Sequence, residues 1–148
     1  MGTGSTIAMQ NVDGTVTAIQ CNWDGYISHN GNILYQFYRE DSKVRQLIRL
    51  GNLSQLQIEI GERHPFDSYG LTEDEKDPRW DSWCKAYGRD RGMPDQQAKS
   101  YSSWREYLAY NGDEYNYLFV PDEGWTVNTY SGNYKLADAL KDDFVENA

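Results

Sequence analysis

The sequence predicts an α+β fold: an antiparallel sheet of about five strands, made of two hairpins and one further strand, with three to four helices packed on one face. Two observations lead to this prediction. Strand-type segments flank turn signals near both ends of the chain, whereas apolar residues recur at helical spacing elsewhere. The 148 residues suit one domain, and no linker or repeat divides them, so we expect a single domain over residues 1–148.

The first hairpin is predicted from residues 6–11 and 15–23, which are rich in strand-forming side chains. Asp13-Gly14 lies between them, and glycine accepts the positive φ that a tight turn needs. Alternation along the second strand places Ile19, Cys21 and Trp23 on one face. We therefore expect a hairpin that is buried on one side.

Two helices and an irregular segment are expected next. Ile33, Leu34, Phe37 and Tyr38 recur at helical spacing, and a second helix is predicted to begin at Asp41-Ser42 and end at Gly51. Residues 61–82 contain prolines, glycines and the charged run 73–77. This composition predicts an irregular, acidic excursion that lies in solvent.

The second half of the chain adds three predicted strands and two predicted helices. A third strand is expected over Trp83–Arg89, and the capping-box pattern Ser103–Glu106 predicts a short helix through Ala109. The fold ends with a second hairpin and a last helix, predicted over residues 114–120, 124–130 and about 135–146.

Composition excludes several classes of protein. There are 23 acidic and 14 basic side chains, hence a net charge of −9, which has the wrong sign for binding nucleic acid directly. Aromatic residues make up 14%, which argues against intrinsic disorder. No apolar run approaches the roughly 18 residues that span a membrane, and the first residues lack the features of a secretory signal. We expect a cytoplasmic protein with no membrane partner.

Several short motifs resemble a family of small uncharacterised bacteriophage and prophage proteins. The motifs are Ser5-Thr6-Ile7-Ala8, Asp13-Gly14, Cys21-Asn22-Trp23-Asp24-Gly25-Tyr26, Lys43-Val44 to Leu50-Gly51, and Ala86-Tyr87-Gly88-Arg89-Asp90-Arg91-Gly92. The resemblance touches most of residues 5–130. It implies a compact accessory protein of viral or prophage origin in the cytoplasm of a bacterial host, and it brings no catalytic residues with it.

One departure from the family pattern bears on chemistry. The family has a histidine before the tryptophan, where this chain has Asn22. An imidazole can act as a base or bind a metal, whereas an amide only forms hydrogen bonds. We therefore favour a structural role for this segment.

Two groups of residues are candidates for a site. Trp23, Asp24 and Tyr26 follow a predicted strand, where Asp24 would be either a rim carboxylate or part of a turn. Arg89 and Arg91 share one face of the predicted third strand. There they would either grip an anion or ligand, or pair with nearby acids in solvent.

The remaining reactive residues are scattered. His29, His64, Cys21 and Cys84 lie in unrelated contexts without metal-ligand spacing, and no nucleotide-binding or nucleophile motif is present. We expect no metal, no cofactor and no catalytic residue, and buried free thiols for both cysteines.

The acidic surface is the strongest functional signal. Its members concentrate in the irregular segment and on the outer face of the last helix, as Glu73, Asp74, Glu75, Asp138, Asp142 and Asp143. Such a surface could occupy the basic groove of a host nucleic-acid-acting defence protein, of CRISPR or restriction type. The alternatives are a module that sequesters a nucleotide or other small ligand, and an unrecognised hydrolase built on Asp24 and a histidine.

Overall fold

The computed structural model describes residues 2–141. Its strands are β1 (Ser5–Gln10), β2 (Val16–Cys21), β3 (Leu53–Gln55), β4 (Lys85–Ala86), β5 (Lys99–Tyr101), β6 (Tyr115–Val120), β7 (Gly124–Thr129) and β8 (Gly132–Lys135). Its α-helices are α1 (Asn32–Phe37), α2 (Asp41–Arg49), α3 (Tyr87–Arg91), α4 (Trp104–Asn111) and α5 (Leu136–Lys141). A π-helical turn, Ile27–Gly31, precedes α1.

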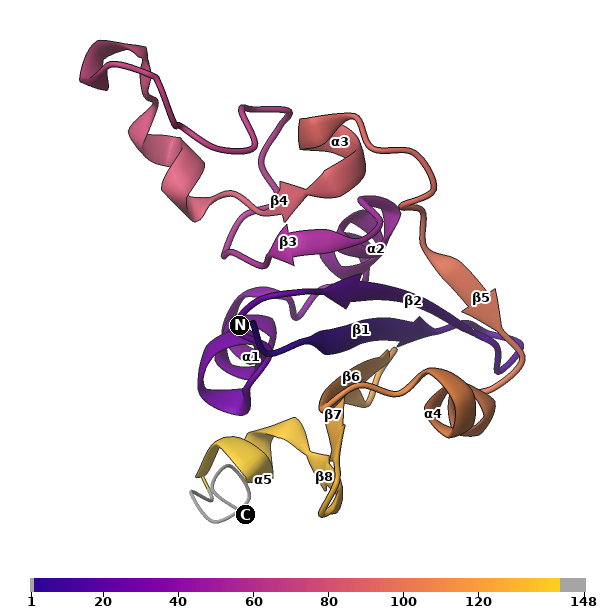
Figure 1. Ribbon diagram of the computed structural model, residues 1–148. Helices are drawn as coiled ribbons and strands as arrows, with labels where there is room; N and C mark the ends of the chain where they lie inside the picture. The colour runs from indigo at the N-terminus through magenta and orange to yellow at the C-terminus, as the bar shows by residue number, and fades with distance from the viewer. Residues whose placement is uncertain (1, 142–148) are drawn as a thin grey trace.

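The fold is α+β, but the predicted five-stranded antiparallel sheet with three to four helices is wrong. The described residues form a mixed sheet of eight strands in the order β4-β3-β2-β1-β6-β7-β8, with β5 paired to β2, and five α-helices (Figure 1). β1 pairs with β6 in parallel, placing Ile7 opposite Tyr117, and β2 meets β3 in parallel at Cys21 and Leu53. The parallel β1–β6 pair joins the two halves of the chain at the centre of the sheet.

Both predicted hairpins are confirmed. β1 and β2 pair antiparallel, with Ile7 opposite Ile19, and β6 and β7 pair antiparallel around the Pro121–Glu123 loop. The strands that the sequence did not indicate (β3, β5 and β8) have only three or four residues each. Such short segments are too brief to show a recognisable alternation of apolar and polar side chains.

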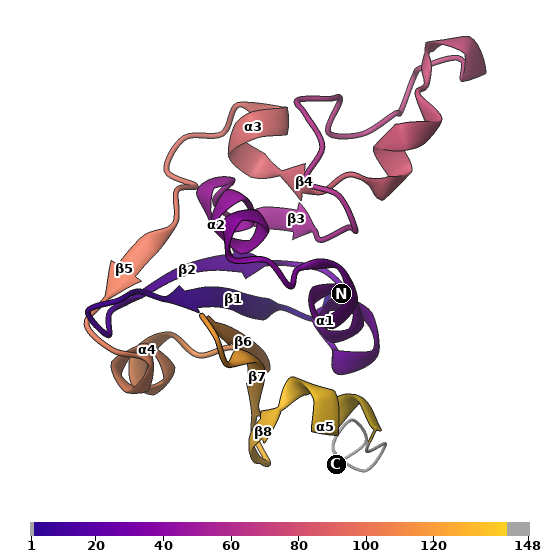
Figure 2. The same ribbon diagram turned by 180° about the vertical axis from the view of Figure 1, so that it is seen from behind.

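Helices cover both faces of the sheet, not one face as predicted. On one face, Leu34 of α1, Leu47 of α2 and Leu136 of α5 pack with inward-pointing strand residues such as Ile7 and Ile19. Figure 2 shows α1 and α2 on this side. On the opposite face α4 covers a smaller core, formed by Ala8, Val16, Ala18, Tyr107 and Leu118. Successive residues of β1 therefore serve different cores, as alternation along a strand requires.

The predicted third strand, Trp83–Arg89, is also wrong. Only Lys85 and Ala86 are in the sheet, and the chain then turns into α3. The Asp90 carboxylate accepts a hydrogen bond from the Ala86 N–H at 2.9 Å, and Gly92 ends the helix with φ 69°. The hydrogen bond to Asp90 and the positive φ of Gly92 both favour a helical turn over an extended chain.

The chain ends, within the described residues, on α5. The prediction of a helix over about 135–146 is met from Leu136 to Lys141, and the rest of that prediction lies outside the described residues. Among residues 2–141, no helix has the length and apolar character needed to cross a lipid bilayer.

Candidate functional site

Residues 61–82, which we call the arm, project from one end of the sheet. The arm runs between β3 and β4 and extends well beyond the body of the protein (Figures 1 and 2). Two 3₁₀ turns, Glu73–Glu75 and Pro78–Ser82, give it local structure. At its base Cys84 N–H donates to the Glu59 carbonyl at 2.9 Å, which closes the two ends of the excursion.

Arg89 of α3 anchors the start of the arm. Its Nη1 donates to the carbonyls of Ile60 and Gly61 at 2.8 and 3.2 Å, and its Nη2 donates to the Cys84 carbonyl at 2.8 Å. Nε and Nη2 also donate to the buried Asp90 carboxylate, at 2.9 and 3.1 Å. All five N–H donors of the guanidinium are therefore used inside the protein.

Backbone geometry at the base of the arm leaves room only for glycine at position 61. Gly61 has φ 71°, and a Cβ atom there would lie 2.3 Å from the Trp83 side chain. Glycine meets both demands, because it has no Cβ and accepts positive φ. The chain can therefore pass close over the indole of Trp83 as it enters the arm.

Aromatic side chains stiffen the lower part of the arm. His64 is stacked on Trp80 and meets Trp83 edge-on, with ring centroids 6.3 and 5.4 Å apart. Arg79 lies over the Trp83 ring, 5.2 Å from its centroid. The Phe66 ring also contacts the ring of Tyr87 on α3, with centroids 5.4 Å apart and planes tilted by 31°, so the arm is braced against α3.

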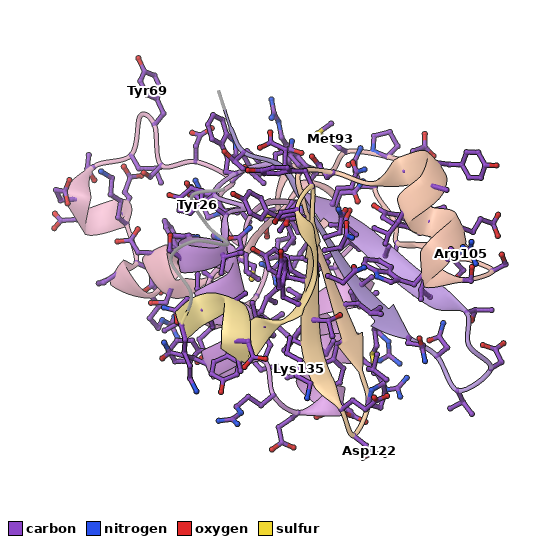
Figure 3. The ribbon with its side chains drawn as sticks, turned by 90° about the horizontal axis from the view of Figure 1, so that it is seen from below. Tyr26, Tyr69, Met93, Arg105, Asp122 and Lys135 are labelled. Atoms are coloured by element: carbon purple, nitrogen blue, oxygen red, sulfur yellow. The ribbon has the colours of Figure 1, made fainter. Side chains whose placement is uncertain are left out.

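Tyr69 is the exception among the aromatic residues of the arm. Its side chain is 96% exposed, and Figure 3 shows it standing out from the ribbon into solvent. The neighbouring Gly70 has φ 85°, and the Asp67 carboxylate accepts a hydrogen bond from the Tyr69 N–H at 3.1 Å. A local turn thus presents this ring at the apex of the arm.

The predicted acidic cluster Glu73, Asp74 and Glu75 lies on the arm, and all three residues are exposed. Glu75 accepts hydrogen bonds from the Thr72 N–H and hydroxyl, which hold the pKa of its carboxyl below the usual value. Glu73 pairs with Lys76 at 3.1 Å. Within the described residues Asp74 makes no hydrogen bond or ion pair, so its charge is uncompensated.

The second acidic cluster is at the other end of the molecule. Asp138 is exposed on α5, which follows β8 at the sheet edge opposite β4 and the arm. Asp142 and Asp143 lie outside the described residues. Among the described residues, the predicted acidic cluster Glu73–Glu75 therefore lies on a different surface from Asp138.

Arg89 and Arg91 do not form the exposed pair that the sequence suggested for an anion. They lie on α3, not on a strand, and Arg89 has no donor left for a ligand. Arg91 is exposed and lies over the Phe66 ring, 5.1 Å from its centroid. In this arrangement Arg89 fastens the arm, whereas Arg91 makes only an exposed ring contact with it.

The segment Trp23–Tyr26 forms a turn after β2. Asp24 has φ 57°, and its carboxylate accepts a hydrogen bond from the Tyr26 hydroxyl at 3.3 Å. A Cβ atom on Gly25 would lie 2.8 Å from the backbone carbonyl oxygen of Gly4, and the buried Asn30 side chain donates to the Trp23 carbonyl. Neither histidine forms a hydrogen bond or ion pair with Asp24 within residues 2–141.

Both cysteines are free and buried. Burial raises the pKa of the Cys21 thiol to about 12 and also raises that of Cys84. In the part of the chain that the structure describes, no three His, Cys, Asp or Glu side chains come together to hold a metal ion.

Two important residues, His64 and Asp90, were not recognised as a pair from the sequence. The sequence predicts Asp90 to lie in an alternating charged strand end, yet it accepts hydrogen bonds from Arg89, Ala86 and the His64 backbone. Gly92 was the available signal, because a glycine after Arg89-Asp90-Arg91 is typical of a helix end. The 26-residue separation of His64 from Asp90 left no local signal for their contact.

Comparison with protein-family models, with curated proteins and with solved structures finds no match in any of the three.

Proposed function

We propose that this chain is a phage-encoded, non-catalytic accessory protein that binds and inhibits a host protein through its acidic arm. The expected partner is a nucleic-acid-acting protein of a bacterial defence system, because a nucleic-acid groove is basic. The phage origin rests on the resemblance of motifs such as Cys21–Tyr26. The binding function rests on the geometry of the arm.

One observation carries the proposal: the arm is a projecting, internally braced segment with an excess of negative charge. Residues 61–82 contain seven acidic and three basic side chains, so the arm has a net charge of −4 within a total of −9. Arg89 fixes its base, and the ring contacts of His64 and Trp83 fix its lower part. Such a segment loses little conformational freedom on binding, which favours affinity.

Tyr69 supports an interface role for the tip of the arm. The Tyr69 side chain is 96% exposed, so almost all of its apolar surface is available for contact with a partner protein. Tyrosine is among the residues that contribute most binding energy at protein interfaces. Carboxylates around such an anchor would steer a basic partner toward it, an effect that weakens as salt screens the charges.

The test is capture of a partner from bacterial lysate with the wild-type protein and two charge variants as baits. The first variant, Glu73→Lys with Asp74→Lys, removes the net charge of the arm and spares Glu75, which caps the 3₁₀ turn. The matched control, Glu123→Lys with Asp138→Lys, makes the same charge change at the far end of the sheet. Captured proteins are quantified by mass spectrometry.

We expect the wild type to retain a stoichiometric partner at about 50 mM salt and to lose it near about 500 mM. The arm variant should retain at least about tenfold less of this partner, whereas the control should match the wild type. A complex that is indifferent to salt and to the arm variant would refute the proposal. If only the control variant lost the partner, the binding surface would lie at the α5 end and the proposal would be wrong.

A further inference from the structure

An imidazole nitrogen on the arm lacks the hydrogen-bond partner that its burial calls for. His64 is 5% exposed, and Nδ1 lies 2.7 Å from the Glu62 carbonyl oxygen. Because a carbonyl oxygen only accepts, Nδ1 carries a proton, and Asp90 Oδ1, 3.5 Å from Nδ1, is a second acceptor on the same side of the ring. In the tautomer whose single ring proton is on Nδ1, Nε2 is an acceptor. Within residues 2–141 nothing donates to Nε2. A buried polar atom of this kind is unusual in a native protein and needs an explanation.

His64 lines a cavity of about 270 Å³ in the arm, whose other walls are rich in carboxylates. Four of the lining residues are acidic (Asp67, Glu73, Asp77 and Asp81), and two are lysines. Glu73 pairs with Lys76, and Asp77 pairs with Arg79 at 2.6 Å. Asp81 makes no hydrogen bond or ion pair in the described part of the chain. The cavity therefore has two acceptors without a hydrogen-bond donor, the Asp81 carboxylate and Nε2 of His64.

The cavity also has an aromatic wall. Trp80 belongs to the lining and stacks on His64. A planar cation that donates several hydrogen bonds suits all three groups, because it can lie along the indole while donating to a carboxylate and to an imidazole nitrogen. A guanidinium group has this shape and this set of donors, whereas an ammonium group has neither the plane nor the fork of donors.

We propose that this cavity receives the guanidinium group of one arginine side chain of the partner protein. The guanidinium donates to Asp81 and to Nε2 of His64 and lies against Trp80. Because the His64 side chain is 1% exposed, the proposal requires the Trp80 ring to shift before the guanidinium can reach Nε2. This inference rests on the proposed function, since it names the chemical group through which a basic partner engages the arm.

The probe is N-acetyl-arginine amide, titrated into the ¹⁵N-labelled full chain and followed by the imidazole nitrogen signals. Binding should move the Nε2 signal of His64 and the indole N–H signal of Trp80. The signals of His29, whose Nδ1 lies 3.0 Å from the Asn30 side-chain oxygen, should stay in place as an internal reference. The citrulline analogue has the same shape without the charge and should produce at least about tenfold weaker shifts.

Two neutral substitutions on the arm separate the cavity from its general charge. Asp81→Asn removes the uncompensated carboxylate of the cavity, and Asp74→Asn removes an exposed carboxylate that does not line it. We expect Asp81→Asn to weaken arginine-amide binding by about tenfold and Asp74→Asn to leave it unchanged within about twofold. Both residues are exposed, so both variants should fold.

The inference is overturned if arginine amide moves no His64 signal at up to tens of millimolar, or if the two variants respond alike. It is also overturned if citrulline amide binds equally well. These outcomes differ from failure of the proposed function, in which no salt-sensitive complex is captured from lysate. A captured complex without an arginine-amide response leaves the proposed function standing and removes only the arginine cavity.

Discussion

Arg89 joins the arm to the sheet through every donor of its guanidinium group. Three of its acceptors are backbone carbonyls, and two of them, on Ile60 and Gly61, belong to the segment that leads into the arm. The fourth partner is the buried carboxylate of Asp90. Because lysine cannot reproduce this planar fork, the arm depends on arginine at this position.

Replacing Arg89 by alanine should destabilise the protein by about 3 kcal/mol, because the buried Asp90 carboxylate would keep its backbone N–H donors but lose its guanidinium partner. Arg91→Ala is the matched control. Arg91 is exposed, so its loss should cost no more than about 0.5 kcal/mol. Urea unfolding followed by tryptophan fluorescence measures both values. Equal effects of the two substitutions would contradict the role assigned to Arg89.

The buried thiol of Cys21 makes stability depend on alkaline pH. Its pKa is raised by burial from 9.0 to about 12 in the folded protein. Below pH 9 the thiol is neutral in both states, and its contribution to stability is fully present. Between about pH 9 and pH 12 the unfolded chain loses the proton while the folded chain keeps it, so stability falls.

We therefore expect a smaller free energy of unfolding at about pH 10.5 than at about pH 8. Cys21→Ala should reduce this difference, although Tyr38, whose pKa is also raised by burial, will preserve part of it. Urea unfolding at the two pH values provides the comparison. A wild-type difference that the substitution leaves unchanged would show that Cys21 does not contribute.

For helices and strands, motifs of neighbouring residues predicted turns and helix starts correctly, whereas the sequence did not predict which distant strands pair. The hairpin turn at Asp13-Gly14 and the helix start at Ser103 depend on neighbouring residues, and both were predicted from the sequence. The parallel pairing of β1 with β6 brings together segments more than 100 residues apart. No local pattern encodes that contact, because the same alternating strand can pair in either direction.

The α3 segment shows why the candidate site was only partly predictable. Strand-like residues before Arg89 suggested an extended chain, but Asp90 binds the Ala86 N–H and favours a helical turn. This change moved Arg89 from an expected exposed position to the base of the arm. The acidic excursion itself was predicted, because a run of charged residues among prolines and glycines rarely lies in a core. The ring contacts that brace it, such as His64 with Trp83 and Phe66 with Tyr87, were not predicted.

The N-cap of α4 gives a test at this scale. Ser103 accepts a hydrogen bond from the Glu106 N–H at 3.1 Å, and α4 covers the smaller core. Ser103→Ala should lower the free energy of unfolding by about 1 kcal/mol. Ser102→Ala, next to it and exposed, should change it by less than about 0.5 kcal/mol. Guanidinium chloride unfolding of both variants decides whether the cap contributes as described.

On the scale of the whole molecule, the sheet separates two acidic regions. The arm lies beyond β4, and α5 follows β8 at the other edge, so the two regions do not form one compact binding site. The arm has the greater reach, the braced base and the exposed Tyr69. We therefore propose that the partner binds the arm, while α5 packs on the core through Leu136 and keeps its outer face in solvent.

Amide hydrogen exchange of the protein alone and in complex with the captured partner tests this central claim most directly. We predict that protection on binding is concentrated in residues 61–82, including the turn at Tyr69, while α5 and the β6–β7 loop exchange at unchanged rates. Protection confined to α5 or to other faces of the sheet, with the arm exchanging as in the free protein, would contradict the account.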